Sequence, residues 1–123
     1  MHAAVQTETL IEALKTGHPS EAQLVTAFAY LQLKKRHFRS GYNREAICRA
    51  LKKVPLNEDQ KAALCTIVLE QIEYAGREFG AFAKLVPLIC SPHFEQRVRA
   101  YAHKGRPYVQ ERIARIIDSY FRQ

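Results

Sequence analysis

Basic residues concentrated in two segments are the part of this sequence best suited to chemistry. Fifteen of the nineteen Lys and Arg residues fall within residues 34–53 and 96–123. Residues 54–95, which lie between them, hold three cations and six anions. Concentrated positive charge attracts polyanions such as nucleic acid, acidic proteins and lipid head groups. The charge pattern therefore predicts a partner that carries negative charge.

The first basic segment holds eight cations and one acid, Glu45. Ile47, Leu51 and Val54 have helical spacing and predict a buried side of the third helix. The solvent side then carries Arg49, Lys52 and Lys53. Aromatic residues among cations can stack a base or flank a phosphate backbone. A solvated helix face with cations near a helix C-terminus explains the same pattern, so both interpretations stay open. The candidate binding residues here are Lys34, Lys35, Arg36, Arg39, Tyr42, Arg49, Lys52 and Lys53.

The second basic segment spreads its cations over two expected helices. Val109, Ile113 and Ile116 define the buried stripe of the last helix, which places its arginines on an exposed side. The preceding turn leads into a proline-headed N-terminus, whose free N–H groups could add to a phosphate site. Glu111 and Asp118 can pair with neighbouring arginines and so weaken the positive electrostatic field of this segment. A solvated amphipathic helix is therefore the alternative interpretation. The candidate binding residues here are Lys104, Arg106, Arg112 and Arg115.

Enzyme chemistry is not indicated by the residue pattern. The five histidines form no metal-ligand pair within an expected helix. The sequence also lacks a Cys-x-x-Cys pair, a glycine-rich phosphate loop and a Gly-x-Ser-x-Gly motif. We therefore expect a binding protein without catalytic residues, metal or cofactor.

The cysteines and the N-terminus both bear on where the protein acts. Cys48, Cys65 and Cys90 are an odd set at wide spacing, each in an apolar neighbourhood. Since disulfide scaffolds are denser, we expect three small buried thiols. Residues 1–8 lack the charged and apolar regions of a signal peptide, and no run of eighteen apolar residues is present. These patterns favour the cytoplasm, with the nucleus as an alternative, and predict no transmembrane segment.

The expected fold is all-α, a compact single domain over residues 1–123. A chain of this length, with 47% hydrophobic and 25% charged residues, has an ordinary globular composition. No alternating apolar pattern of strand length is present. Short loops predict that successive helices pack antiparallel. About seven helices are expected, near residues 9–16, 20–39, 43–54, 57–76, 78–89, 91–104 and 107–123.

Capping and breaking residues set these boundaries. Capping-box spacing begins at Thr9, Ser20 and Asn57, and Asn43 is expected to cap the third helix. Pro87 must end or bend the fifth helix. The second and fourth helices carry apolar residues around most of their circumference, which predicts a central place for both.

The last third of the chain resembles HEAT-type helical hairpins. Residues 82–89, Phe-Ala-Lys-Leu-Val-Pro-Leu-Ile, are similar to an A helix with a Leu-x-Pro-x-Leu pattern. Residues 94–100, Phe-Glu-Gln-Arg-Val-Arg-Ala, are similar to a B helix that begins near Val-Arg-x-x-Ala, and residues 108–117 look like another B helix. The resemblance implies a stack of α-hairpins used as a binding surface rather than as a catalyst.

Two functions from different classes follow. The first is a small helical protein that binds nucleic acid through both basic segments. The second is a protein-interaction module, an adaptor or inhibitor, that recognises an acidic partner. Binding to an anionic membrane is less favoured, because no helix combines a bulky apolar face with exposed anchors. Whether the two basic segments converge on one surface would separate these functions.

Overall fold

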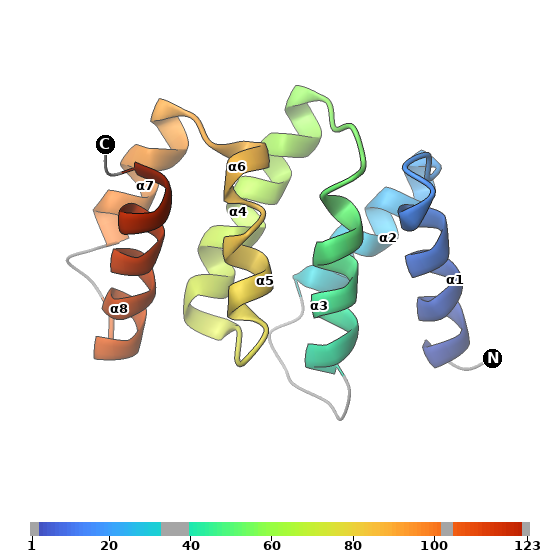
Figure 1. The fold of residues 1–123 in the computed structure, drawn as a ribbon, viewed down its shortest axis with the longest axis horizontal. Coiled ribbons are helices and arrows are strands. Elements are labelled where there is room, and N and C mark those ends of the chain that lie inside the picture. Colours follow the sequence, from blue (N-terminus) through green and yellow to red (C-terminus); the bar gives the residue numbers. More distant parts are fainter. Residues whose placement is uncertain (1–2, 33–39, 102–104, 122–123) are drawn as a thin grey trace.

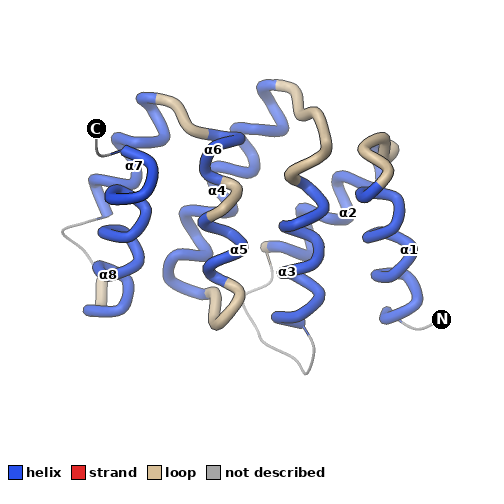
Figure 2. The backbone as a smooth tube through the Cα atoms, in the orientation of Figure 1, coloured by secondary structure: helices blue, strands red, loops and turns tan. Residues whose placement is uncertain are grey.

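A computed structural model describes residues 3–32, 40–101 and 105–121, all of it helices and connecting segments (Figure 2). Those residues include no strand, so the all-α class is confirmed. No helix in these ranges has both the length and the apolar character needed to cross a membrane. The elements are α1 (Ala3–Lys15), α2 (Glu21–Leu31), α3 (Ser40–Leu51), α4 (Glu58–Tyr74), α5 (Phe79–Ala83), α6 (Val86–Ile89), α7 (Pro92–Tyr101), α8 (Pro107–Ile116) and the π-helix η1 (Ile117–Phe121).

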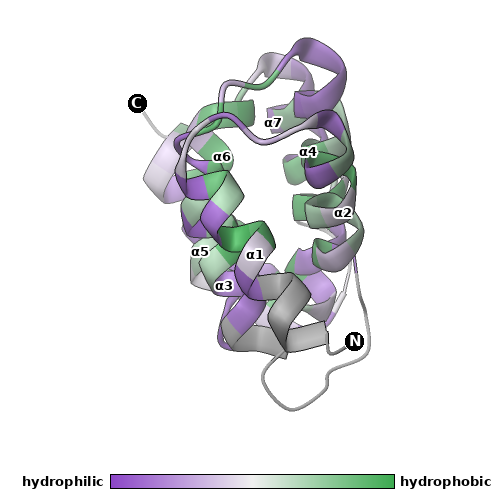
Figure 3. Cartoon of the chain, turned by 90° about the vertical axis from the view of Figure 1, so that its right-hand side faces the viewer, coloured by the Kyte–Doolittle hydropathy of each residue, from purple (hydrophilic) through white to green (hydrophobic). Residues whose placement is uncertain are grey.

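The helices form two layers, and the chain passes back and forth between them. In Figure 1, α1, α3, the α5–α6 pair and α8 lie in front, and α2, α4 and α7 lie behind. Figure 3 shows the two layers from one end. The order along the front layer is α1, α3, α5, α8, so α5 lies between two helices that are far apart in the sequence.

Helix α4 is the centre of the hydrophobic core. Leu64, Ile67, Val68, Leu69 and Ile72 on this helix are all buried. They cover most of its circumference, because α4 packs against α2, α5, α6, α7 and α8. The central place predicted for α4 is thus confirmed.

Helix α2 has neighbours on several sides but is not fully enclosed. It packs against α1, α3 and α4, and its residues Leu24 and Leu31 are buried. Val25 is 63% exposed, so one side of this helix faces solvent. The physical reason is its position at the N-terminal end of the rear layer, where α4 is its one neighbour in that layer (Figure 1).

Two of the expected helix starts are confirmed by complete capping boxes. The backbone N–H of Gln23 donates to Ser20 Oγ at 3.1 Å, and the Ser20 N–H donates to Gln23 Oε1 at 2.7 Å. Asn57 and Gln60 repeat this exchange at the start of α4, at 2.8 and 2.9 Å. Such caps satisfy N–H groups that the helix itself leaves unpaired.

Two other expected starts were wrong. Helix α1 begins at Ala3, so Thr9 lies inside it. Helix α3 begins at Ser40, so Asn43 also lies inside a helix. The Asn43 side chain instead donates to the Tyr30 hydroxyl at 3.2 Å and joins α3 to α2. A tertiary hydrogen bond therefore replaces the local cap that its residue type favours.

Pro87 interrupts the fifth expected helix, but the interruption lies two to three residues before the proline itself. Helix α5 ends at Ala83 and α6 begins at Val86, with Pro87 in its first turn. A proline ring has no N–H to donate to the carbonyl four residues back, which here belongs to Ala83, and it clashes with that carbonyl. The break therefore falls at Lys84 and Leu85, and Pro87 occupies a position where proline is tolerated.

The last helix changes pitch near its end. Val109, Ile113 and Ile116 are buried, as their spacing predicts. Residues 117–121 then form the π-helix η1, in which hydrogen bonds span five residues instead of four. This extra residue per turn brings Phe121 onto the buried side and leaves Tyr120 only partly buried. The Phe121 ring packs against that of Phe94, with centroids 6.2 Å apart.

Candidate anion-binding surface

Part of the first basic segment lies on the exposed side of α3. Ile47 and Leu51 are fully buried, and the helical repeat therefore turns Arg49 and Lys52 toward solvent. Lys52 and Lys53 both follow the last residue of the helix, Leu51, and Lys53 is exposed as well. Several predicted site residues lie outside the described residues or have side chains that are not described: Lys34, Lys35, Arg36, Arg39, Tyr42 and Lys104.

A first groove, the α3–α5 groove, lies where these two helices pack together. It has a volume of about 260 Å³ and its charged lining residues are Glu45, Arg49, Lys52 and Lys84. Arg49 pairs with Glu45 at 3.1 Å, but its side chain is 70% exposed, so the pair contributes little and is easily exchanged. No described carboxylate forms an ion pair with Lys52 or Lys84. The groove thus carries excess positive charge.

A second groove, the α5–α8 groove, lies on the other side of α5. Its volume is also about 260 Å³. Four of its lining residues are charged, namely Arg77, Glu111, Arg112 and Arg115. Tyr108 adds an aromatic ring that is 39% exposed. This groove, too, has three cations against one acid.

The two grooves meet at Gly80, which lines both of them. Arg49 and Lys52 come from the first basic segment and Arg115 from the second, so the fold brings the two segments to opposite sides of one short helix. We call the two grooves with the α5 ridge between them the basic surface. Its cations are Arg49, Lys52, Arg77, Lys84, Arg112 and Arg115, and its acids are Glu45 and Glu111.

Lys84 and Arg77 were missed by the sequence analysis. Both belong to the stretch in which anions outnumber cations, so a count along the chain gives them no weight. They reach the basic surface because α5 lies between α3 and α8 (Figure 1). To predict these two residues, one would have to know which helices are neighbours in the folded protein.

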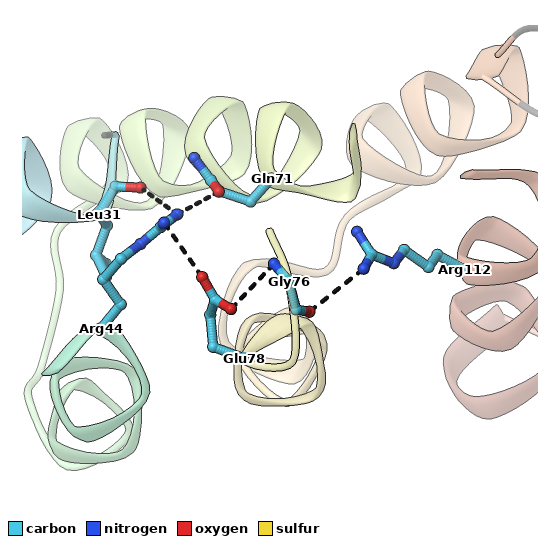
Figure 4. Close-up of polar contacts among 6 residues, drawn as sticks. All are labelled: Leu31, Arg44, Gln71, Gly76, Glu78 and Arg112. Carbon is cyan, nitrogen blue, oxygen red and sulfur yellow. Dashed lines mark hydrogen bonds and ion pairs between the residues drawn. The ribbon is translucent and has the colours of Figure 1, made fainter. Parts of the chain in front are cut away.

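Arg112 has a structural position that its sequence context did not predict. Its Nη1 donates to the Ile72 carbonyl at 2.9 Å. Its Nη2 donates to the Gly76 carbonyl at 3.3 Å (Figure 4). These carbonyls lie at and beyond the C-terminal end of α4, where helix carbonyls lack partners and carry partial negative charge. The guanidinium also lies 4.7 Å from the Phe79 ring centroid. Arg112 therefore holds α8 on α4 and is not a freely exposed cation.

Arg44, counted with the first basic segment, is completely buried. Its guanidinium forms an ion pair with Glu78 at 3.2 Å, donates to the Leu31 carbonyl at 3.3 Å and donates to Gln71 Oε1 (Figure 4). Glu78 Oε1 in turn accepts the Gly76 N–H at 3.0 Å. The cluster links the two layers at the N-terminal end of α5, next to the turn that Arg112 contacts.

The sequence held a signal for this buried arginine. Arg44 lies three, four and seven residues before Ile47, Cys48 and Leu51, which are all buried. This spacing places it on the inner stripe of α3. Arg44 was counted in the charge of the first basic segment but was not among the candidate binding residues, and its burial removes it from the cations of that segment that a ligand can reach.

Arg106 lies apart from the two grooves. It is exposed and occupies the cap position of α8, ahead of Pro107, without a side-chain capping hydrogen bond. Its backbone carbonyl accepts the N–H groups of Val109 and Gln110 at 2.9 and 3.1 Å. Neither Arg106 nor Lys53 lines the basic surface.

The three cysteines differ in exposure. Cys48 is buried as expected, Cys65 is half-buried and Cys90 is exposed, so the prediction of a buried thiol was wrong for Cys90. Cys90 follows α6 in an extended conformation and so lies outside any buried helical stripe. Burial raises the pKa of the Cys65 thiol, which donates to the Ile89 carbonyl at 3.6 Å. Burial also raises the pKa of Cys48.

Cys65 and Cys90 line a separate cavity of about 330 Å³, where α4 faces α7. Lys61, His93 and Arg97 also line it. In the part of the chain that the structure describes, no group of three or more His, Cys, Asp or Glu side chains could hold a metal ion. The cavity therefore offers thiols and cations, without a metal-binding geometry among the described residues.

Comparisons with known proteins give no relative for this chain. No protein-family model matches it, and neither a curated protein nor a solved structure matches it. Its function has to be inferred from the residues and geometry of the basic surface.

Proposed function

We propose that this protein binds nucleic acid, through contacts between the basic surface and the phosphate backbone. One observation carries the proposal: cations of both basic segments line grooves that share Gly80. Phosphate contacts by Lys and Arg supply most of the affinity of nucleic-acid-binding proteins and depend on several cations acting on one strand or duplex. A binding role rather than catalysis, in the cytoplasm or the nucleus, is part of the same proposal.

The state of the cations favours this function. No described carboxylate forms an ion pair with Lys52, Arg77 or Lys84, so they can meet phosphates without first breaking an ion pair. Arg49 can exchange its exposed partner Glu45 for a phosphate at little cost. Arg112 stays on its backbone carbonyls and contributes only long-range charge.

An acidic protein partner is the competing function. Nucleic acid is favoured because the positive charge lines two grooves, and one of them also holds an exposed aromatic ring, Tyr108. A chain of phosphates and bases can fill such grooves and stack on a ring. An acidic helix or folded protein would instead make most of its contacts with the outer edges of the grooves.

Charge reversal with a matched control tests the proposal. The variant Lys52→Glu, Lys84→Glu, Arg115→Glu removes three cations of the basic surface. The control Lys15→Glu, Lys61→Glu, Arg99→Glu makes the same change in net charge at exposed or half-exposed residues that do not line either groove. Both should remain folded, although each control change also gives up one exposed ion pair, with Glu12, Glu58 or Glu95, that contributes about 0.5 kcal/mol or less.

Binding is measured by fluorescence anisotropy with a labelled oligonucleotide and, in parallel, with labelled poly-glutamate, at about 50 mM salt. The proposal predicts that the surface variant loses at least roughly tenfold in oligonucleotide affinity and that the control loses much less. Equal losses in the two variants would show that net charge alone acts and would contradict the proposal. Tighter binding of poly-glutamate than of the oligonucleotide would replace it with the acidic-protein function.

A further inference from the structure

The ridge between the two grooves carries a glycine where the grooves meet. It is formed by α5, which has five residues, and Gly80 on this helix lines both grooves. A Cβ atom built on Gly80 would have no neighbour within 4 Å, so the space above it is open. The two grooves are therefore separated at this point by bare backbone, which a ligand chain can approach closely.

The α5–α8 groove also presents a fixed aromatic ring. Tyr108 is 39% exposed, and its hydroxyl donates to the Glu73 carbonyl at 2.8 Å. The Arg112 guanidinium lies 5.1 Å from its ring centroid, and that of Arg115 lies 5.9 Å from the centroid of Phe79. The ring is thus held in place with the Arg112 guanidinium over one face, so an unpaired base would stack on the opposite face, with cations nearby for its phosphate.

We propose that the basic surface binds single-stranded nucleic acid, and that the strand crosses α5 at Gly80 with phosphates in both grooves and a base on Tyr108. This inference rests on the proposed function and narrows it to one class of ligand. A duplex is stiff over the length of this protein and keeps its bases stacked inside. It therefore has no free base to place on Tyr108.

A single strand fits the same geometry without deformation of a helix. Its backbone bends freely, so it follows the surface down into the α3–α5 groove, over Gly80 and into the α5–α8 groove. Arg49, Lys52 and Lys84 then meet phosphates on one side of the ridge, and Arg77 and Arg115 meet them on the other. RNA and DNA strands share this chemistry.

Anisotropy titrations with four ligands test the ligand class. The ligands are an RNA strand and a DNA strand of about 12 nucleotides with the same sequence, and the corresponding RNA and DNA duplexes. The inference predicts that at least one single strand binds more tightly than its own duplex by roughly tenfold or more, or about 1.4 kcal/mol. Duplexes that bind as tightly as the strands would overturn it and leave the proposed function standing. Absence of binding to all four would instead remove the proposed function.

Two matched pairs of variants test the path of the strand. Gly80→Gln places a neutral side chain on the ridge, and Gly80→Ala controls for the loss of glycine; neither should lower the melting temperature, since the site is open and helical. Gly80→Gln should weaken single-strand binding by roughly fivefold or more, or about 1 kcal/mol, relative to Gly80→Ala. Equal affinities of the two would overturn the crossing at Gly80.

Tyr108→Leu and Tyr108→Phe form the second pair. The first removes the ring, and the second keeps the ring and removes the hydroxyl. Because one stacked base is lost, Tyr108→Leu should bind the single strand with roughly tenfold lower affinity. The affinity of Tyr108→Phe should be much nearer that of the wild type. If both variants lose the same affinity, Tyr108 acts only by orienting its neighbours and the stacking contact is contradicted.

Discussion

Arg44 and Glu78 form an ion pair that is closed to solvent. The two side chains are 0% and 4% exposed, and Arg44 Nη1 lies 3.2 Å from Glu78 Oε2. The pair is supported by Gln71 on the rear layer and by the Gly76 N–H at the base of α5 (Figure 4). Because these groups belong to α3, α4 and the turn before α5, the pair fixes the helix that separates the two grooves.

The first prediction concerns the stability that this pair provides. Removing one partner of a buried ion pair leaves the other charge uncompensated in a medium that solvates it poorly. Glu78→Gln should therefore lower the free energy of unfolding by about 3 kcal/mol, measured by urea denaturation with circular dichroism. Glu73→Gln changes an exposed glutamate nearby and should stay within about 0.5 kcal/mol of the wild type.

The double variant Arg44→Met, Glu78→Leu separates charge from packing. It removes both charges at once and should recover most of the stability that Glu78→Gln loses, because apolar residues often replace a buried pair without cost. A double variant as unstable as the single one would mean that shape or hydrogen bonding, and not the uncompensated charge, is responsible.

A second prediction distinguishes the two arginines of α8. Arg112 donates to the carbonyls of Ile72 and Gly76, so Arg112→Ala should cost about 2 kcal/mol of stability. Arg115 is exposed and makes no backbone hydrogen bond among the described residues, so Arg115→Ala should cost about 0.5 kcal/mol or less. Thermal melts of both variants measure the difference, and equal destabilisation would contradict the capping role of Arg112.

The third prediction concerns thiol reactivity. Cys90 is exposed, Cys65 is half-buried with a raised pKa, and Cys48 is buried. A thiol reagent should label one cysteine quickly in the native protein, a second slowly, and the third only after unfolding, because the thiolate is the reactive form. Cys90→Ser should remove the fast phase. Persistence of that phase in the variant would assign it to another cysteine.

The fourth prediction follows from the buried Cys48 thiol. Its pKa is raised in the folded state, so above about pH 8.5 the unfolded chain loses this proton while the folded protein keeps it. The thiol therefore stabilises the fold at lower pH, and this stability is lost as pH rises, by up to about 1.4 kcal/mol per pH unit. Urea denaturation between about pH 7 and 10 should show a shallower decline for Cys48→Ala than for the wild type. Val68→Ala, a buried substitution that removes no ionisable group, serves as control and should leave the slope unchanged.

Elements set by local chemistry could be predicted from the sequence. Ser20 and Asn57 start helices because their side chains satisfy N–H groups within three residues, and this needs no other part of the chain. Thr9 has the same spacing, but the helix start predicted there was wrong, because α1 already begins at Ala3. A capping motif thus permits a helix start, and the residues before it decide whether one occurs.

The basic surface could be predicted only in part. The exposure of Arg49 and Lys52 followed from the helical repeat of α3. The contributions of Arg77 and Lys84 depend on α5 lying between α3 and α8, which is a property of the tertiary arrangement. The resemblance of residues 82–120 to HEAT hairpins stays a prediction, since no family model, curated protein or solved structure matches the chain.

The most direct test of nucleic-acid binding is the salt dependence of the wild-type affinity for a single strand. Five cations of the basic surface are available for phosphates, namely Arg49, Lys52, Arg77, Lys84 and Arg115. Counterion release then predicts that a plot of log affinity against log salt has a slope of about −3.5. The variant Lys52→Glu, Lys84→Glu, Arg115→Glu should reduce the magnitude of that slope by roughly 2. A wild-type affinity that does not change with salt, or no binding at low salt, would contradict the account.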